Sequence, residues 1–273
     1  MKKLARFYQI ANLLSLDVAA GAIVSGLFFG RIFQVDILSW GLGALGLTVW
    51  IIYTADHLYD ARQLNTPASS DRHRFHQRHF KVLLFALLVT LSVDLILISL
   101  LRKPVFNAGL MLGVIVGIYL LIQRNLKSLK ELSGAMLYCS GVALPALSIT
   151  HFPITTFQGL LLAQFGITVF CNLLLFSLFD LRADLRDRHN SFVTVMGEEK
   201  TRLFLTTLFI INSFLIVLQM FHYPKIVGAA VVMLVMNLIL FLIFIFPRLF
   251  EINGLYRLLG DAVFLVPGFF LLI

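Results

Sequence analysis

Long apolar runs alternate with short charged clusters along the whole chain. A helix needs about 20 apolar residues to cross a bilayer, and runs of this kind recur from one end of the chain to the other. They cover residues 9–31, 37–57, 80–101, 104–123, 133–152, 157–179, 202–221, 225–247 and 254–272. The third and fourth runs are separated only by "RKP", which predicts a tight hairpin. The pattern predicts an all-α membrane protein with nine transmembrane helices.

The composition agrees with this pattern. Hydrophobic residues make up 59% and charged residues 13% of the 273 residues, and the mean hydropathy is +0.92. A soluble domain carries about 25% charged residues, so a soluble fold is excluded. No flexible linker or separate polar domain interrupts the runs, and we expect residues 1–273 to form one domain. Cys139 and Cys171 fall inside predicted helices, so we expect free buried thiols.

The positions of Lys and Arg predict the orientation, because loops on the cytoplasmic side are enriched in basic residues. If the N-terminus lies inside, all but four of the 22 Lys and Arg residues fall in inner segments. The exceptions are Arg31, Arg102, Lys103 and Lys225. Nine spans then place the C-terminus outside, and the acidic loops on the cytoplasmic side of the cell (inner) membrane. Attraction to anionic headgroups explains the net charge of +8 without a nucleic-acid partner.

The start of the chain, "MKKLARFYQIANLLSL", has the basic and apolar parts of a secretory signal. However, Asn12 and Asp17 interrupt its apolar stretch, and no small-residue cleavage site follows a short core. We therefore expect a first helix that is retained.

Two inner loops carry the same acidic pattern. Asp56 and Asp60 end the second apolar run, and Asp180 and Asp184 end the sixth. Residues four apart share one face of a helix, with Cβ atoms about 5–6 Å apart, and like charges at that spacing are mildly destabilising. Both pairs are followed by basic residues and they stand four spans apart, which indicates a weak internal repeat.

Two acid pairs that face each other would place four carboxylates around a small volume. Hard oxygen ligands of this kind suit Mg²⁺, which binds through a few carboxylates and the phosphates of a substrate. Neighbouring basic side chains would hold the phosphate oxygens. The candidates are Arg62, Arg124, Lys127 and Arg182. From the residues alone, an open alternative is that the acids are solvated or paired with neighbouring arginines.

The second loop resembles the second aspartate motif of the UbiA superfamily of intramembrane aromatic prenyltransferases. In that family an Asp-x-x-x-Asp pair is followed by a small polar residue and then by a glycine. The matching residues here are Asp180, Asp184, Ser191 and Gly197. "YTADHLYDAR" resembles the first motif of the family through Asp56 and Asp60, and "YLLIQRNLKSLKELSGAML" followed by "GVALPA" resembles the region of its fourth and fifth helices.

The resemblance implies a ring of nine helices around a central cavity that opens sideways to lipid. It also implies a prenyl diphosphate bridged by Mg²⁺, which ionises to an allylic cation and alkylates a lipophilic or aromatic acceptor dissolved in the membrane. The implied catalytic and metal-binding acids are Asp56, Asp60, Asp180 and Asp184. The implied diphosphate contacts are Arg62, Arg124 and Lys127.

Three positions depart from the family's pattern. Asp56 stands where the family usually has Asn, and an acid there can still bind a cation. The third acid of the first motif would be Leu64, which cannot bind a cation, and the third position of the second motif is Arg188. Asp187 lies one residue before Arg188 and is a candidate substitute. A member of the family that has lost activity and only binds lipids is therefore an open alternative.

Three further acids, Asp17, Asp94 and Asp261, lie within predicted helices, where ionisable groups are costly and usually face a cavity. We expect Asp17 and Asp261 to face the interior of the bundle, where they would bind an acceptor or remove a proton; a packing role is the alternative. Asn172 lies two helical turns before Asp180, and it would either face the cavity or form an interhelical hydrogen bond.

His73, His76 and His79 have helical spacing, but they stand among arginines. We interpret them as part of a basic cap near lipid headgroups rather than as a metal site.

Two other classes of function compete with prenyl transfer. A secondary transporter would use the buried acids as cation sites, although the acid pairs lie at the inner edge and not at the midplane. A CDP-alcohol phosphotransferase would need a glycine that "DHLYDAR" lacks.

Overall fold

The computed structural model describes residues 2–63, 66–187, 189–224 and 227–272. Over these ranges the chain is helical and contains no strand, so the predicted all-α class is confirmed. The long helices are α2 (Leu16–Phe33), α3 (Ser39–Gln63), α5 (Phe80–Ser99), α6 (Lys103–Ile122), α7 (Lys130–Ile149), α8 (Thr156–Asp187), α10 (Glu198–His222) and α11 (Val227–Ile245). The shorter elements are α1 (Lys2–Leu13), α4 (Asp71–Arg78), η1 (Gln123–Leu129), α9 (Phe192–Met196), α12 (Pro247–Glu251), η3 (Ile252–Gly254), α13 (Leu255–Ala262) and η4 (Val263–Leu272).

Seven segments of the described ranges are long and apolar enough to cross a membrane. One of them, Lys103–Ile149, contains both α6 and α7, which η1 joins, and so covers two of the predicted runs. α3 has 25 residues but carries Asp56, His57 and Asp60 in its last turns, and it is not among the seven. The structure thus agrees with a multi-pass membrane protein.

The first apolar run is not one continuous helix, and the prediction of a single span over 9–31 is wrong in this respect. α1 ends at Leu13 and α2 begins at Leu16. Between them, Ser15 has a φ of 55°, a left-handed conformation that residues with side chains rarely adopt. The Asn12 amide donates to Asp17 Oδ2 across this break, 2.5 Å away, so polar side chains stabilise the interruption.

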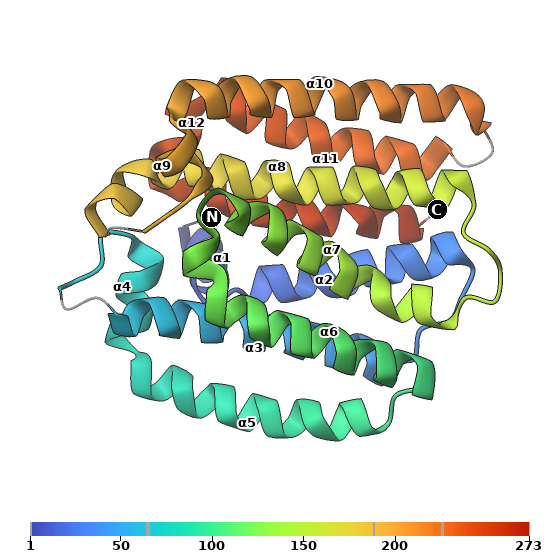
Figure 1. The fold of residues 1–273 in the computed structure, drawn as a ribbon, viewed down its shortest axis with the longest axis horizontal. Helices are drawn as coiled ribbons and strands as arrows, with labels where there is room; N and C mark the ends of the chain where they lie inside the picture. The colour runs from blue at the N-terminus through green and yellow to red at the C-terminus, as the bar shows by residue number, and fades with distance from the viewer. Residues whose placement is uncertain (1, 64–65, 188, 225–226, 273) are drawn as a thin grey trace.

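The long helices lie side by side along the long axis of the molecule (Figure 1). The short helices α4, α9 and α12 gather at one end, on the left of that view, and the two chain termini lie toward opposite ends of the axis. α3 leads into α4 and α8 leads into α9, so both acid pairs belong to the end that carries the short helices.

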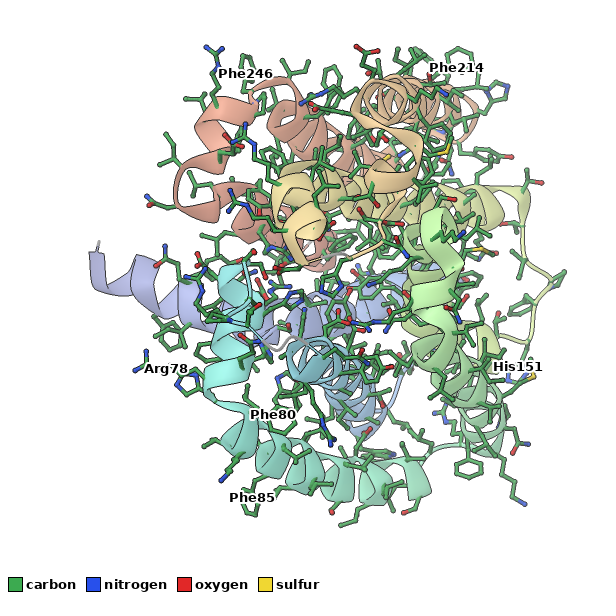
Figure 2. All side chains as sticks on the ribbon, turned by 60° about the vertical axis from the view of Figure 1, so that its left-hand side comes forward. Arg78, Phe80, Phe85, His151, Phe214 and Phe246 are labelled. Atoms are coloured by element: carbon green, nitrogen blue, oxygen red, sulfur yellow. The ribbon has the colours of Figure 1, made fainter. Side chains whose placement is uncertain are left out.

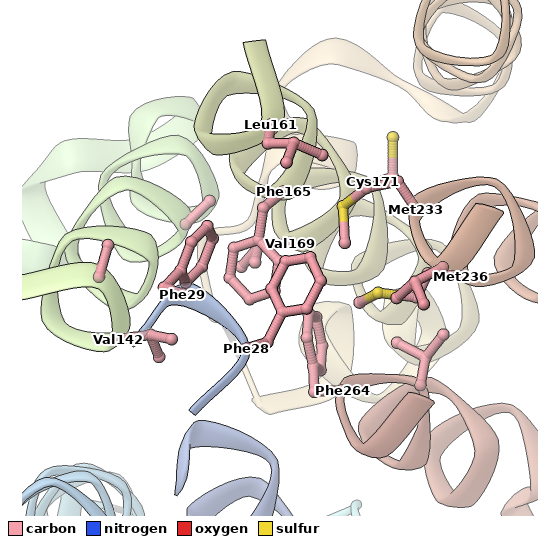
Figure 3. Packing of buried hydrophobic residues seen from close by; sticks show 14 of the residues in the cluster. Phe28, Phe29, Val142, Leu161, Phe165, Val169, Cys171, Met233, Met236 and Phe264 are labelled. Atoms are coloured by element: carbon pink, nitrogen blue, oxygen red, sulfur yellow. The ribbon is translucent and has the colours of Figure 1, made fainter. Parts of the chain in front are cut away.

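Aromatic side chains pack together in the interior of the bundle (Figure 3). The Phe29 and Phe165 rings meet edge to face with centroids 5.2 Å apart, and Phe264 of η4 lies 5.8 Å from Phe165. All three side chains are almost fully buried. Aromatic packing therefore fills the space between α2, α8 and η4 around these rings.

α5 and α6 lie on the outside of the bundle. Among their described residues, α6 buries none, and α5 buries only Leu83 and Asp94. Figure 2 shows Phe85, Phe214 and Phe246 pointing outward from the periphery, and all three are exposed in the isolated chain. An apolar surface of this extent is unfavourable in water, so it fits contact with the acyl chains of a bilayer.

Candidate functional site

The two acid pairs lie on the last turns of two long helices. α3 continues to Gln63 and α8 to Asp187, beyond the apolar runs, so both Asp-x-x-x-Asp patterns are helical. Residues at this spacing share a helix face. Because α3 and α8 end on the same side of the molecule, the fold brings the two pairs to one end of the bundle (Figure 1).

The segment after α8 is held in place by the residues that match the family motif. Ser191 is the N-cap of α9 and forms a capping box with Thr194, which satisfies backbone groups at the start of that helix. Gly197 ends α9 with a φ of 86°, which a glycine adopts without steric cost. Glu131, at the start of α7, accepts a hydrogen bond from the Phe192 amide at 2.8 Å. The polar residue and the glycine therefore shape the turn beside the acids.

The first acid pair contacts both η1 and α4. Asp56 accepts a hydrogen bond from the side-chain amide of Gln123. Asp60 is buried, and its carboxylate lies 3.8 Å from the Arg124 guanidinium and 3.9 Å from Nε2 of His73. Arg124, predicted as a diphosphate contact, is thus next to an acid.

The second pair contacts α13, near the C-terminus. Asp180 accepts a hydrogen bond from the Tyr256 hydroxyl at 2.6 Å and forms an ion pair with Arg257. The Tyr256 ring stacks on Phe179, one residue before Asp180, with centroids 4.3 Å apart. Sequence reasoning did not assign Tyr256 or Arg257 to the site, since only the folded chain places them beside Asp180.

Lys130 lies within electrostatic reach of acids from both pairs. It is the first residue of α7 and lies close enough to Asp56, Asp60 and Asp184 to interact electrostatically with each of them. An ammonium group within electrostatic reach of acids on both α3 and α8 indicates that the ends of these two helices lie near one another. Lys130 is part of the stretch that resembles the family, but sequence reasoning favoured Lys127.

The other predicted basic residues lie elsewhere. Arg62 is exposed and lines an open cavity of about 560 Å³, together with Arg74 and Arg78. Lys127 is exposed and has a φ of 49°, at a kink of η1, and Arg182 is exposed on α8. The described structure does not bring these three side chains to the carboxylates, and their role as phosphate contacts stays a prediction.

The histidines of the basic cap do not act as one group. His76 and His79 each donate from Nδ1 to the carbonyl oxygen four residues earlier, at 2.9 and 3.0 Å. His73 instead lies beside His189, with ring centroids 5.6 Å apart. Burial and the nearby His189 lower the pKa of His73 to about 4, so its ring is neutral at pH 7.

Asp187, the last residue of α8, is hydrogen-bonded to the segment just before α4. Both of its carboxylate oxygens accept hydrogen bonds from Ser69, from the hydroxyl at 2.6 Å and from the backbone N–H at 3.0 Å. Two of the departures from the family pattern, Leu64 and Arg188, lie outside the residues that the structure describes.

Asp17 and Asp261 are buried, as predicted, in one polar cluster. The Asn12 amide donates to both carboxylates, at 2.5 Å and 2.8 Å. Arg72 of α4 donates to Asp261 at 3.0 Å and to the Asn12 carbonyl and side-chain oxygens at 3.1 Å. This cluster joins α1, α2 and α13 to α4, which favours the packing alternative for both acids.

The remaining polar residues within the helices are also buried. Asp94 accepts a hydrogen bond from Thr48 at 2.7 Å, so it faces α3 and not lipid. Asn172 is buried next to Gly260: a Cβ built on that glycine would lie 2.6 Å from Asn172 Oδ1. Asn172 therefore lies at the packed contact between α8 and α13.

The chain matches no protein-family model, and no curated protein matches it. Solved structures do match over nearly the full length. The apo structure of a UbiA homolog from Aeropyrum pernix K1 has a TM-score of 0.66 at 14% identity, covering 96% of both chains.

A UbiA homolog from Archaeoglobus fulgidus bound to GPP and Mg²⁺ also has a TM-score of 0.66 at 14% identity, covering 95% of this chain and 97% of that one. A structure described for digeranylgeranylglyceryl phosphate synthase in membranes has a TM-score of 0.54 at 12% identity, covering 98% of each chain. The chain therefore has the fold of the UbiA homologs.

Proposed function

We propose that this chain, which has the fold of the UbiA homologs, is an integral-membrane prenyltransferase. It would transfer a prenyl group from a prenyl diphosphate to a lipophilic or aromatic acceptor dissolved in the membrane. The observation that carries the proposal is the position of Lys130, within electrostatic reach of acids on both α3 and α8. The ends of these two helices thus form one polar site beside an apolar bundle.

The donor groups of this site fit Mg²⁺. Hard carboxylate oxygens, several of them in reach of one cationic group, are the ligands that this ion prefers, together with substrate phosphates. The residues that would hold it are Asp56, Asp60, Asp180 and Asp184. When bound, the ion would neutralise the charge that develops on the departing diphosphate. A homolog with this fold has been solved with both GPP and Mg²⁺.

The protein's own groups have definable tasks in this reaction. Arg124 and Lys130 would donate hydrogen bonds to non-bridging diphosphate oxygens and so hold the leaving group at the mouth of the bundle. The bond between the allylic carbon and the diphosphate oxygen breaks, and its electron pair leaves with the diphosphate. The acceptor then forms a bond to that carbon and gives up a proton, which the released diphosphate can accept. The apolar side chains of the bundle would keep water away from the cation.

The membrane arrangement is part of the proposal. Nine crossings, with α3 counted as one and α6 and α7 as two, would place the N-terminus and the acid pairs on the cytoplasmic side of the inner membrane. The C-terminus would lie outside. The asymmetry of Lys and Arg along the chain supports this orientation, and so does the gathering of α4 and α9 at the end that carries the acids (Figure 1).

Substitution of one acid from each pair tests the proposal. Asp60→Asn and Asp184→Asn keep the shape of the side chain but remove a charged ligand, and each should lower the rate of diphosphate release by about a hundredfold or more. Lys130→Met should also lower the rate. Asp71→Asn is the matched control, because Asp71 is 89% exposed on α4 and its side chain pairs only with Arg74 among the described residues.

The assay would use membranes with equal amounts of each variant, labelled dimethylallyl and geranyl diphosphates, and Mg²⁺ or a chelator. The proposal predicts release by the wild type that depends on Mg²⁺ and is lost in the acid variants. If Asp60→Asn and Asp184→Asn release diphosphate as fast as Asp71→Asn, the two pairs do not form the site. A wild type without any release would favour a protein that only binds lipids.

A further inference from the structure

Three side chains with metal-binding atoms converge beside the acid pairs. Nitrogen atoms of His73 and His189 and a carboxylate oxygen of Asp187 all lie within 4.8 Å of one another. His73 comes from α4, while Asp187 and His189 come from the end of α8 and the segment after it. We propose that these three residues bind a divalent transition metal of the zinc class, at a site separate from the four paired acids.

The donor set selects this class of metal. Imidazole nitrogen is a borderline ligand that suits Zn²⁺, Fe²⁺ and similar ions, whereas Mg²⁺ prefers oxygen ligands. Three protein ligands, two histidines and one carboxylate, leave at least one coordination position open, as in catalytic zinc sites. This site therefore differs from the paired acids in the ion that it would take and in the atoms that it offers.

The separations suit a single ion. Ligands about 2.0–2.2 Å from zinc at tetrahedral angles are about 3.4 Å apart, so atoms that lie within 4.8 Å of one another need to close by at most about 1.4 Å. A movement of this size is within what rotation about the χ1 and χ2 bonds of a histidine can produce.

The surroundings orient the ligands. Ser69 donates hydrogen bonds to both Asp187 oxygens, at 2.6 and 3.0 Å, and each oxygen retains a lone pair for a cation. The His189 backbone N–H donates to the Asp184 carbonyl oxygen at 2.9 Å, which fixes the segment after α8. Partners of this kind hold a metal ligand in its binding orientation.

One ring nitrogen of this cluster lacks a partner. Nε2 of His189 is buried and makes no hydrogen bond to any described part of the chain. A buried polar atom without a partner is unfavourable, since it loses its hydrogen bond to water. A metal ion beside this nitrogen would remove that penalty, and this second observation points independently to the same site.

The position of the site suggests its effect. His73 Nε2 is 3.9 Å from the Asp60 carboxylate, so the metal would add positive charge directly beside the acid pairs. In the sequence, Asp187 and His189 flank the place where the family's pattern has a third acid. The second ion would thus supply positive charge at the place where the family's third acid is missing. Metal binding by these three residues does not depend on the proposed prenyl transfer.

Metal binding by the purified protein tests the proposal directly. The full chain in detergent would be stripped with a chelator, dialysed against a low concentration of Zn²⁺ with excess Mg²⁺, and measured for bound zinc by elemental analysis. Co²⁺ would serve as a spectroscopic probe of the same site. The variants are His189→Gln and His73→Gln, with His79→Gln, at the residue that follows α4, as the control.

The wild type and His79→Gln should retain about one more equivalent of zinc than either of the other variants. They should also show a Co²⁺ absorption band that His189→Gln lacks. Circular dichroism identifies a variant that does not fold, and the second variant then decides. Equal zinc in the wild type, His73→Gln and His189→Gln would place the metal on other acids, and it would overturn the proposal. So would a wild type that binds no zinc.

Discussion

The ion pair between Arg72 and Asp261 provides a quantitative test of how the short helices are held on the bundle. Both side chains are 6% exposed, and the guanidinium nitrogen lies 3.0 Å from the carboxylate. Arg72→Met keeps much of the volume and the apolar part of the side chain but removes the charge. Asp261 would then keep the Asn12 amide as its donor but lose its charged partner, beside the buried Asp17.

The expected loss of stability is large. Removing one partner of a buried ion pair lowers the free energy of unfolding by about 3–5 kcal/mol, because it leaves a buried charge without compensation. For a chain of this size, 1 kcal/mol shifts the Tm by roughly 2–4 °C, so the Tm should fall by roughly 6–20 °C. The Arg72 guanidinium also donates to the Asn12 oxygens at 3.1 Å, which adds to the loss.

Thermal unfolding in detergent would be compared for the wild type, Arg72→Met, Asp261→Asn and the double variant. Asp261→Asn removes the charge that Arg72→Met leaves unpaired. The free energy of unfolding of the double variant should therefore fall by at least about 1 kcal/mol less than the two single losses added together. Hydrogen exchange of the α4 amides should rise in Arg72→Met if α4 detaches before the bundle unfolds.

Arg78→Met is the matched control. Arg78 is exposed on the same helix and lines the open cavity beside α3, so its replacement should change the free energy of unfolding by no more than about 0.5 kcal/mol. If Arg72→Met unfolds within about 2 °C of the wild type and its α4 amides exchange as slowly, the cluster does not hold α4 in place.

Two further predictions concern packing and orientation. Gly260→Ala should lower the free energy of unfolding by about 1–3 kcal/mol, because a Cβ at Gly260 would lie 2.6 Å from Asn172 Oδ1. Gly113→Ala, with nothing within 4 Å of the added atom, should not destabilise, and equal unfolding curves for the two variants would contradict the packing argument. A cysteine in place of the exposed Thr66 should react with a membrane-impermeant thiol label added on the cytoplasmic side. A tag after the last residue should be detected only from the outer side. Detection of both from the same side would refute the nine-span topology.

Local patterns in the sequence were enough to predict the helices and the location of the acids. Apolar runs determine where helices form in a membrane, since the backbone must satisfy its hydrogen bonds within each segment. The run at 157–179 therefore became α8, and the helix continued to Asp187. The four-residue spacing of Asp180 and Asp184 then placed both acids on one helix face. These are short-range effects, and a pattern within a few turns reports them.

The contacts that complete the site depend on the tertiary structure. Arg72 meets Asp261 across 189 positions of sequence, and Arg257 meets Asp180 across 77. The three-residue spacing of the cap histidines predicted no partner for His73, which lies beside His189. The break at Ser15 was also missed, since it depends on side chains that hydrogen-bond only once the chain is folded. Periodicity describes which face a residue occupies, but the neighbour on that face is chosen by how the helices pack.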